Sequence, residues 1–132
     1  MVKRGEIYMA NLHKMNGSVQ HGFRPVLVVQ NNTGNKNSPT TIVVPITTKK
    51  QNKHYLPVHV RITRVNELKE ESVALCEQLM TIDQSDLETR IGSINRRKKI
   101  EINVAIAVSV MPGCVGTICR KYKVKNPLKK LK

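Results

Sequence analysis

The sequence predicts a mainly β (α+β) domain in which a small, strongly curved β-sheet or half-open barrel is followed by one C-terminal helix. Several short segments alternate apolar and polar residues or run continuously apolar, and clusters of Gly, Pro and Asn separate them. A long run with helical spacing of apolar residues appears near the C-terminus. At 132 residues, one domain is long enough to bury its own core.

The N-terminal part is predicted to contain two strands joined by a loop. Residues 6–12 alternate between two faces, as a strand does. Residues 13–23 have no period and contain two glycines, so we expect a loop of a length that often carries function. Pro25 holds the chain extended at Arg24, and residues 26–30 form an apolar run typical of a strand buried on both faces.

The middle of the chain is predicted to continue with strands and turns. Residues 31–40 are rich in Asn, Gly and Ser and are expected to form a loop or wide turn. Residues 40–48 form the third strand, in which Pro45 indicates an edge or a bulge. Residues 56–63 alternate as a strand with one solvated face, and this face includes His59. The elements expected next are a turn at 64–71, one strand at 72–82, a short helix capped by Asp83 and a brief strand at 91–95.

The C-terminal part is predicted to form a helix and a tail. Asn95 is the expected N-cap, and Pro112 with Gly113 ends the helix. The apolar residues at helical spacing are Ile100, Val104, Ala107, Val108 and Met111. Of the 13 residues from Arg120 to Lys132, 7 are basic and none is acidic, so we expect a disordered or loosely docked tail. We therefore divide the chain into a domain at 1–112 and a basic, flexible tail at 113–132.

Charge is the strongest global signal. Lys and Arg number 23 against 9 Asp and Glu, giving a net charge of +14, and no acidic residue lies between Glu6 and Glu67. This distribution favours a polyanionic partner, although a basic surface without a dedicated ligand is the alternative. The basic run at 96–99 and the tail are either solvated or add phosphate contacts that do not depend on base sequence.

The sequence also indicates the location of the protein and the redox state of its cysteines. No apolar run is long enough for a signal peptide or a membrane span, so we expect a cytoplasmic protein without a membrane partner. Cys76, Cys114 and Cys119 make an odd count, which favours reduced thiols. Zinc binding by these three cysteines is the alternative, but no His follows the last two, so no metal is expected.

Three features form a possible site. A Gly-containing polar loop leads to Arg24 and Pro25 at the start of one strand, while Thr47 and Thr48 close the next strand. If the two strands are antiparallel, Arg24 and Thr47 lie at the same rim of the sheet.

The chain resembles the MazF/PemK toxins, the mRNA interferases of type II toxin–antitoxin pairs. The resemblance rests on "VKRGEIYMANL", "GSVQHGFRPVLVVQNNTGNKNSPTTIVVPITT", "LPVHV" and "SVALCEQLMTID", which occur in the family's order and cover roughly Val2 to Val110. It implies an SH3-like β-barrel of the CcdB/PemK type, a homodimer and sequence-specific, metal-independent cleavage of single-stranded RNA with no cofactor. It also implies a cognate antitoxin whose acidic segment occupies the RNA groove.

The resemblance also implies roles for individual residues. Arg24 and Thr47 match the family's catalytic arginine and threonine, and Ser18, Gln20 and Gln78 match positions that line the RNA groove. We also expect RNA contacts from Asn31, Thr48 and Glu77.

The chemistry that the resemblance implies is attack of the RNA 2'-hydroxyl on the adjacent phosphorus, which leaves a cyclic phosphate. It needs a base, an acid and donors for the charge on the phosphoryl oxygens. Arg24 suits the last role because a guanidinium stays charged and offers several donors to phosphate. Thr47 can donate a hydrogen bond, but its hydroxyl is a poor base.

One position departs from the family pattern. Many relatives carry an acidic residue where this chain has Val19, and His21 is a candidate for the acid–base role, although a solvated loop histidine is the alternative. His54 and His59 are interpreted as surface residues. Arg24 pairing structurally with Glu77, and Thr47 as an ordinary edge-strand threonine, are the corresponding alternatives. Competing functions are an RNA- or DNA-binding module that does not cleave, and a gyrase poison on a related barrel.

Overall fold

The computed structural model describes residues 1–12, 22–48, 57–63, 68 and 70–131. Its strands are β1 (Glu6–Leu12), β2 (Gly22–Val28), β3 (Thr40–Thr48), β4 (His59–Ile62), β5 (Ser72–Leu75), β6 (Met80–Asp83) and β7 (Leu87–Ser93). Its helices are α1 (Asn32–Asn37), α2 (Arg96–Val110) and α3 (Val115–Tyr122), with short 3-10 turns η1 (Gln84–Asp86), η2 (Pro112–Cys114) and η3 (Pro127–Leu131).

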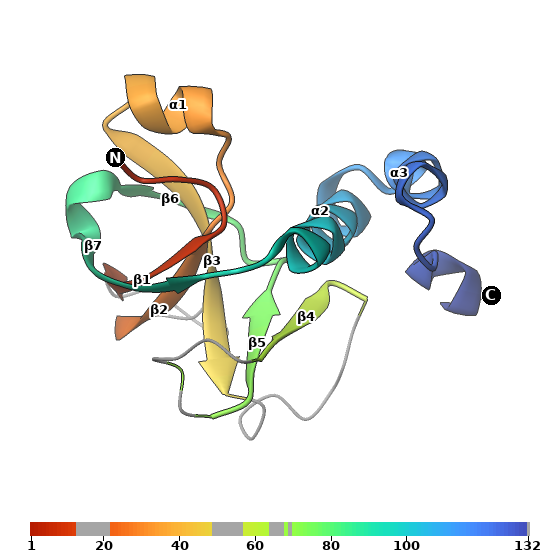
Figure 1. Ribbon diagram of the computed structural model, residues 1–132, viewed down its shortest axis with the longest axis horizontal. Helices are drawn as coiled ribbons and strands as arrows, with labels where there is room; N and C mark the ends of the chain where they lie inside the picture. The colour runs from red at the N-terminus through yellow and green to blue at the C-terminus, as the bar shows by residue number, and fades with distance from the viewer. Residues whose placement is uncertain (13–21, 49–56, 64–67, 69, 132) are drawn as a thin grey trace.

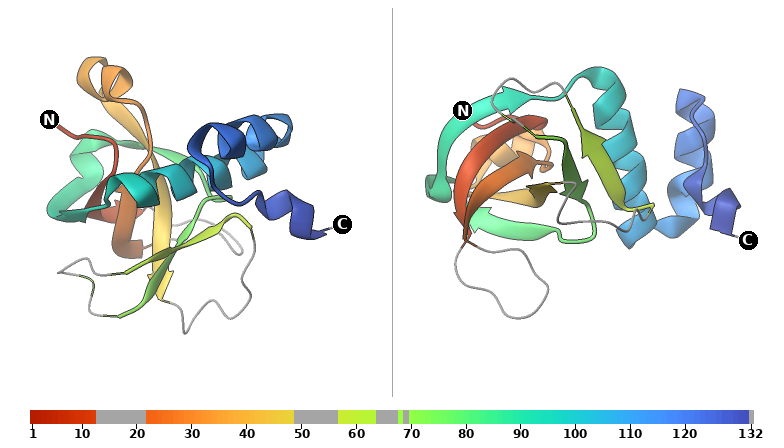
Figure 2. Two further views of the ribbon diagram at one scale, coloured as in Figure 1. Left: turned by 45° about the vertical axis from the view of Figure 1, so that its right-hand side comes forward. Right: turned by 90° about the horizontal axis from the view of Figure 1, so that it is seen from below.

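The strands form one antiparallel seven-stranded sheet that curves around an aliphatic core (Figures 1 and 2). The strand order is β4-β5-β3-β2-β1-β7, and β6 pairs with the first half of β3. Within the described strands, β4 and β7 end the sheet and do not pair, so the barrel is open there. The predicted mainly β fold with helical structure at the C-terminus is confirmed.

Strand β3 spans the whole sheet and pairs with different strands at its two ends. Residues 40–43 pair with β6, and residues 46–48 pair with β5. Pro45 lies between these two ladders, opposite Val26 of β2. The strand accommodates the proline because neither β5 nor β6 pairs with it at this point.

The expectation of a single strand over residues 72–82 is wrong. A turn at Cys76 and Glu77 divides this segment into β5 and β6, which pair with opposite ends of β3. One continuous strand could not make both pairings, because the two ladders with β3 are offset by three residues, which the turn accommodates.

The expectation of a loop over residues 31–40 is also wrong in part, because residues 32–37 form α1. Asn31 caps this helix by accepting a hydrogen bond from the Gly34 amide at 2.8 Å. Asn35 is only 2% exposed, and its amide oxygen accepts a hydrogen bond from the Thr41 hydroxyl at 2.7 Å. These contacts attach α1 to the start of β3.

Helix α2 begins where the sequence predicts, because the Asn95 side chain accepts a hydrogen bond from the Lys98 amide at 2.8 Å. Its buried residues differ from the predicted face: they are Ile102, Val104, Ala105 and Ala107, whereas Met111 is 56% exposed. The difference arises because Ile102 and Ala105 pack on the sheet core, while Val104 and Ala107 pack on α3.

The expected loose tail is instead largely helical. Helix α3 lies beside α2 (Figure 2, right), and its Val115 and Cys119 are buried in a cluster with Val104 and Ala107. Helix α3 ends at Lys123, which adopts the left-handed conformation of a C-cap with φ 55°. The basic composition of the segment hides this apolar face in the sequence, and Arg120 and Lys121 of α3 are exposed.

Candidate active site

An open cavity of about 530 Å³ lies where β2 begins and β3 ends. Its polar lining comes from three strands or the segments beside them: Arg24 from β2, Thr47 and Thr48 from β3, and Glu70 and Ser72 at the start of β5. The apolar wall consists of Met9, Pro25, Ile46, Leu68 and Ile91.

The sheet register brings Arg24 and Thr47 together. Val26 pairs with Pro45 in the antiparallel ladder of β2 and β3, and the same register continued by two residues places Arg24 opposite Thr47. Pro25 follows Arg24 directly, and the buried valines of β2 follow Pro25. Together they fix the backbone that carries Arg24. The cavity therefore has a guanidinium and a hydroxyl on adjacent strands.

The two groups differ in exposure. Arg24 is half-buried, and this burial lowers the pKa of its guanidinium. A guanidinium begins so far above neutral pH that it stays charged all the same. Thr47 is only 5% exposed, so its hydroxyl is held in the cavity wall. The site therefore presents a fixed positive charge beside a nearly fixed hydroxyl.

Sequence reasoning missed two residues of this cavity. The Ser72 hydroxyl donates a hydrogen bond to the Glu70 carbonyl oxygen at 3.0 Å, and the exposed Glu70 side chain adds a carboxylate to the lining. Both residues lie in the cavity because Ser72 pairs with Thr48, which places the residues just before β5 next to the end of β3. That pairing is a tertiary contact and cannot be inferred from either segment alone.

Asn31 lies away from the cavity. It follows the C-terminal end of β2, whereas Arg24 is near the other end, and its side chain caps α1. Asn31 therefore does not line the cavity of Arg24, and its contact with RNA stays a prediction.

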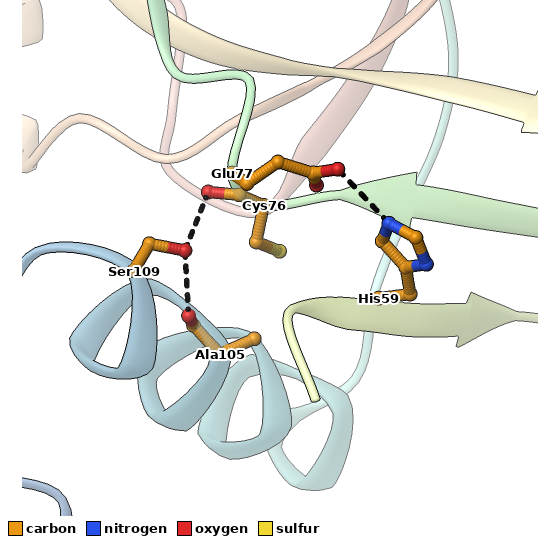
Figure 3. A network of polar contacts seen from close by, with 5 residues as sticks. All are labelled: His59, Cys76, Glu77, Ala105 and Ser109. Carbon is orange, nitrogen blue, oxygen red and sulfur yellow. Dashed lines mark hydrogen bonds and ion pairs between the residues drawn. The ribbon is translucent and has the colours of Figure 1, made fainter. Parts of the chain in front are cut away.

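Glu77 and Gln78 follow β5 and do not line the cavity. The Glu77 carboxylate lies 3.0 Å from Nε2 of His59, which is only 7% exposed (Figure 3). His59 is thus not a surface residue as expected, because β4 packs against β5 and the carboxylate satisfies the buried ring. Because the Glu77 carboxylate contacts His59, the alternative in which Glu77 pairs with Arg24 is not needed to explain Glu77.

The remaining site predictions fall on Ser18, Val19, Gln20 and His21, which lie outside the described residues. Among the residues that the structure does describe, no three His, Cys, Asp or Glu side chains are grouped to hold a metal ion. In that same part of the chain, no helix has the length and apolar character to cross a membrane.

The fold and the cavity define a small antiparallel β protein with an open cavity lined by a guanidinium and hydroxyl groups. Residues 3–110 match the family of the PemK-like, MazF-like toxins of type II toxin–antitoxin systems, and the chain belongs to this family.

Individual relatives agree with this assignment. The chain is 42% identical to the endoribonuclease MazF of Staphylococcus saprophyticus over 111 residues, which are 83% of this chain and 92% of the relative. It is 41% identical over the same length to the endoribonuclease MazF of Staphylococcus epidermidis. Among solved structures, the Mycobacterium tuberculosis toxin MazF-mt6 matches with a TM-score of 0.66 and 28% identity, covering 79% of this chain and 94% of that one. A mycobacterial endoribonuclease in complex with its cognate antitoxin shares the fold, with a TM-score of 0.69 at 21% identity over 83% of this chain and 95% of that one.

Proposed function

We propose that this toxin, an endoribonuclease, cuts single-stranded RNA at a short sequence without a metal ion. The 2'-hydroxyl oxygen attacks the adjacent phosphorus, the bond from phosphorus to the 5'-oxygen breaks, and a 2',3'-cyclic phosphate remains. The observation that carries this proposal is that Arg24 and Thr47 line one open cavity.

The cavity residues have separate roles in this reaction. The Arg24 guanidinium donates to the phosphoryl oxygens as negative charge accumulates on them. The hydroxyls of Thr47 and Thr48 add neutral donors to the same phosphate. Each group is carried by a strand of the sheet, so little reorganisation is needed when the charge develops.

Glu70 is our candidate for the base. Its carboxylate lines the cavity with Arg24, and a carboxylate can accept the proton of the 2'-hydroxyl. The leaving 5'-oxygen takes a proton from water or from His21, which lies outside the described residues. Glu70 would thereby supply the acidic group that Val19 cannot.

As a member of a type II toxin family, the protein has an antitoxin as its partner. We propose that an acidic segment of this antitoxin enters the RNA-binding surface, because the chain carries a net charge of +14 and Arg24 lines that surface. The site of action is the cytoplasm, where messenger RNA is available.

The test is to map cuts on a long single-stranded RNA in the presence of a chelator. We expect discrete cuts with cyclic phosphate ends. Arg24→Ala should reduce the rate by about 10²- to 10³-fold, since it removes a preorganised donor to the transition state. Arg90→Ala is the matched control, because Arg90 pairs with Glu6 at 2.7 Å and does not line the cavity.

Glu70→Gln tests the assignment of the base in the same assay. It should slow cleavage by about 10²-fold or more and leave RNA binding intact. Full activity of this variant would remove Glu70 from the mechanism. RNA that stays uncut but bound by the parent protein would instead favour the binding module that does not cleave.

A further inference from the structure

The chain has a second basic groove, separate from the cavity of Arg24. It has a volume of about 1060 Å³ and lies between the first turns of α2, the start of β4 and the segment that follows α3. Its basic lining residues are Arg96, Arg97, Lys98, Lys123 and Lys125. We call this surface the C-terminal groove.

Two distant basic stretches meet in the C-terminal groove because α3 packs on α2. Cys119 of α3 is 3% exposed and anchors the segment behind it. The Val124 amide donates to the Cys119 carbonyl at 3.0 Å, and the Cys119 thiol donates to the Lys125 carbonyl at 3.6 Å. Lys123, between them, has the left-handed backbone of the helix C-cap. The lysines are thus placed by an ordered turn.

The C-terminal groove is lined by far more basic than acidic residues. Glu101 is the only acidic residue among the described lining residues, and Lys98 lies 2.9 Å from its carboxylate. The other four basic side chains, those of Arg96, Arg97, Lys123 and Lys125, are exposed. A groove with this balance attracts a polyanion.

We propose that the C-terminal groove binds the phosphodiester backbone of single-stranded RNA outside the segment that is cut. This inference rests on the proposed function, which supplies the RNA. Exposed, flexible lysines and arginines suit phosphate contacts that do not depend on base identity. Val124, which also lines the groove and is 36% exposed, offers an apolar surface to sugars and base faces.

The expected consequence is tighter binding of long RNA than of short RNA. For single strands, the slope of log affinity against log salt concentration is about −0.7 for each phosphate neutralised. Contacts in the C-terminal groove therefore add to the salt dependence of binding. They leave the chemistry in the Arg24 cavity unchanged.

The binding test uses 2'-O-methylated polyuridine, which has no free 2'-hydroxyl and cannot be cut by the proposed chemistry. The double variant Lys123→Gln and Lys125→Gln should bind it more weakly, with a salt slope shallower by about 1.4. The matched control is Lys3→Gln with Lys36→Gln, which removes the same charge from two exposed side chains near α1. Equal losses in the two double variants, or no loss in either, would overturn the proposal.

Two further measurements distinguish RNA binding in the C-terminal groove from binding of an acidic peptide and from failure of the proposed function. The groove variant should cut a short oligonucleotide at the parent rate and show a raised KM only for long RNA. If it binds polyuridine normally but polyglutamate more weakly, the groove is a site for an acidic peptide and the RNA proposal fails. If the parent cuts no RNA, the proposed function fails, while the polyuridine titration still reports on the groove. Circular dichroism melting verifies that each variant is folded.

Discussion

Cys76 shows how burial determines the chemistry of a single residue. It is 0% exposed, and its carbonyl oxygen accepts a hydrogen bond from the Ser109 hydroxyl at 3.2 Å (Figure 3). Burial, helped by the neighbouring Glu77 carboxylate, raises the pKa of the Cys76 thiol to about 12. Cys119 belongs to a different buried cluster, so the two cysteines do not form the zinc site considered as an alternative. Cys76 is therefore a core residue.

This pKa predicts how stability depends on pH. The unfolded thiol loses its proton near its ordinary pKa of 9.0, whereas the folded thiol keeps it up to about 12. The free energy of unfolding therefore falls as pH rises above 9, by about 1.4 kcal/mol at pH 10 from this group. Urea unfolding at pH 7 and pH 10 should show a larger loss for the parent than for Cys76→Ala. Equal losses would contradict the assignment.

At the scale of elements, α1 is attached to the sheet by a network of amide side chains. The Asn35 amide oxygen accepts from Gln30 Nε2 at 3.0 Å and from Thr41, while Asn35 Nδ2 donates to the Gln30 carbonyl at 3.0 Å. Gln84 Nε2 donates to the Asn35 carbonyl at 2.9 Å from the other side. A six-residue helix is too short to be stable alone, so these contacts hold it.

Replacing Asn35 tests this network. Asn35→Ala leaves the buried Thr41 hydroxyl without its acceptor and should lower the free energy of unfolding by about 1–3 kcal/mol. Asn37→Ala is the control, since Asn37 is exposed and its side chain donates only to Thr33 within the same helix. Denaturant unfolding of both variants gives the comparison. Equal stabilities would mean that the network does not hold α1.

At the scale of the whole molecule, the end of α2 exposes apolar surface. Val110 is 57% exposed and Met111 is 56% exposed. Both line an apolar cavity of about 460 Å³ together with Leu79, Met80, Ile106 and Ile118. We propose that the chain forms a homodimer in which a second copy covers this surface, since pairing it buries apolar area that a monomer leaves in water.

Charge substitution at this surface should separate the copies. The double variant Val110→Glu and Met111→Glu should sediment as the 14.9 kDa chain, while the parent sediments at twice that mass. Added salt should favour the parent dimer, because each copy carries +14. Asn37→Glu, on the exposed face of α1, is the control and should remain dimeric. A parent protein that sediments as a monomer would rule out the dimer, and a variant that stays dimeric would place its interface elsewhere.

Features that depend on a few neighbouring residues could be predicted from the amino-acid sequence. Strands β1 and β3 and the start of α2 were predicted correctly, because side-chain alternation and the Asn95 cap act over short distances. The pair of Arg24 and Thr47 could be anticipated for a different reason: their strands are consecutive in the chain, and an antiparallel pair brings the start of one strand beside the end of the other.

Features that depend on residues distant in the chain became apparent from the folded protein alone. Helix α1 depends on Asn35 meeting Thr41 and Gln84, and the burial of His59 depends on Glu77. Glu70 lines the cavity because β5 pairs with the end of β3. The basic C-terminal segment is helical because α3 packs on α2. In each case the stabilising contact forms only after the chain has folded back on itself, so no local pattern could reveal it.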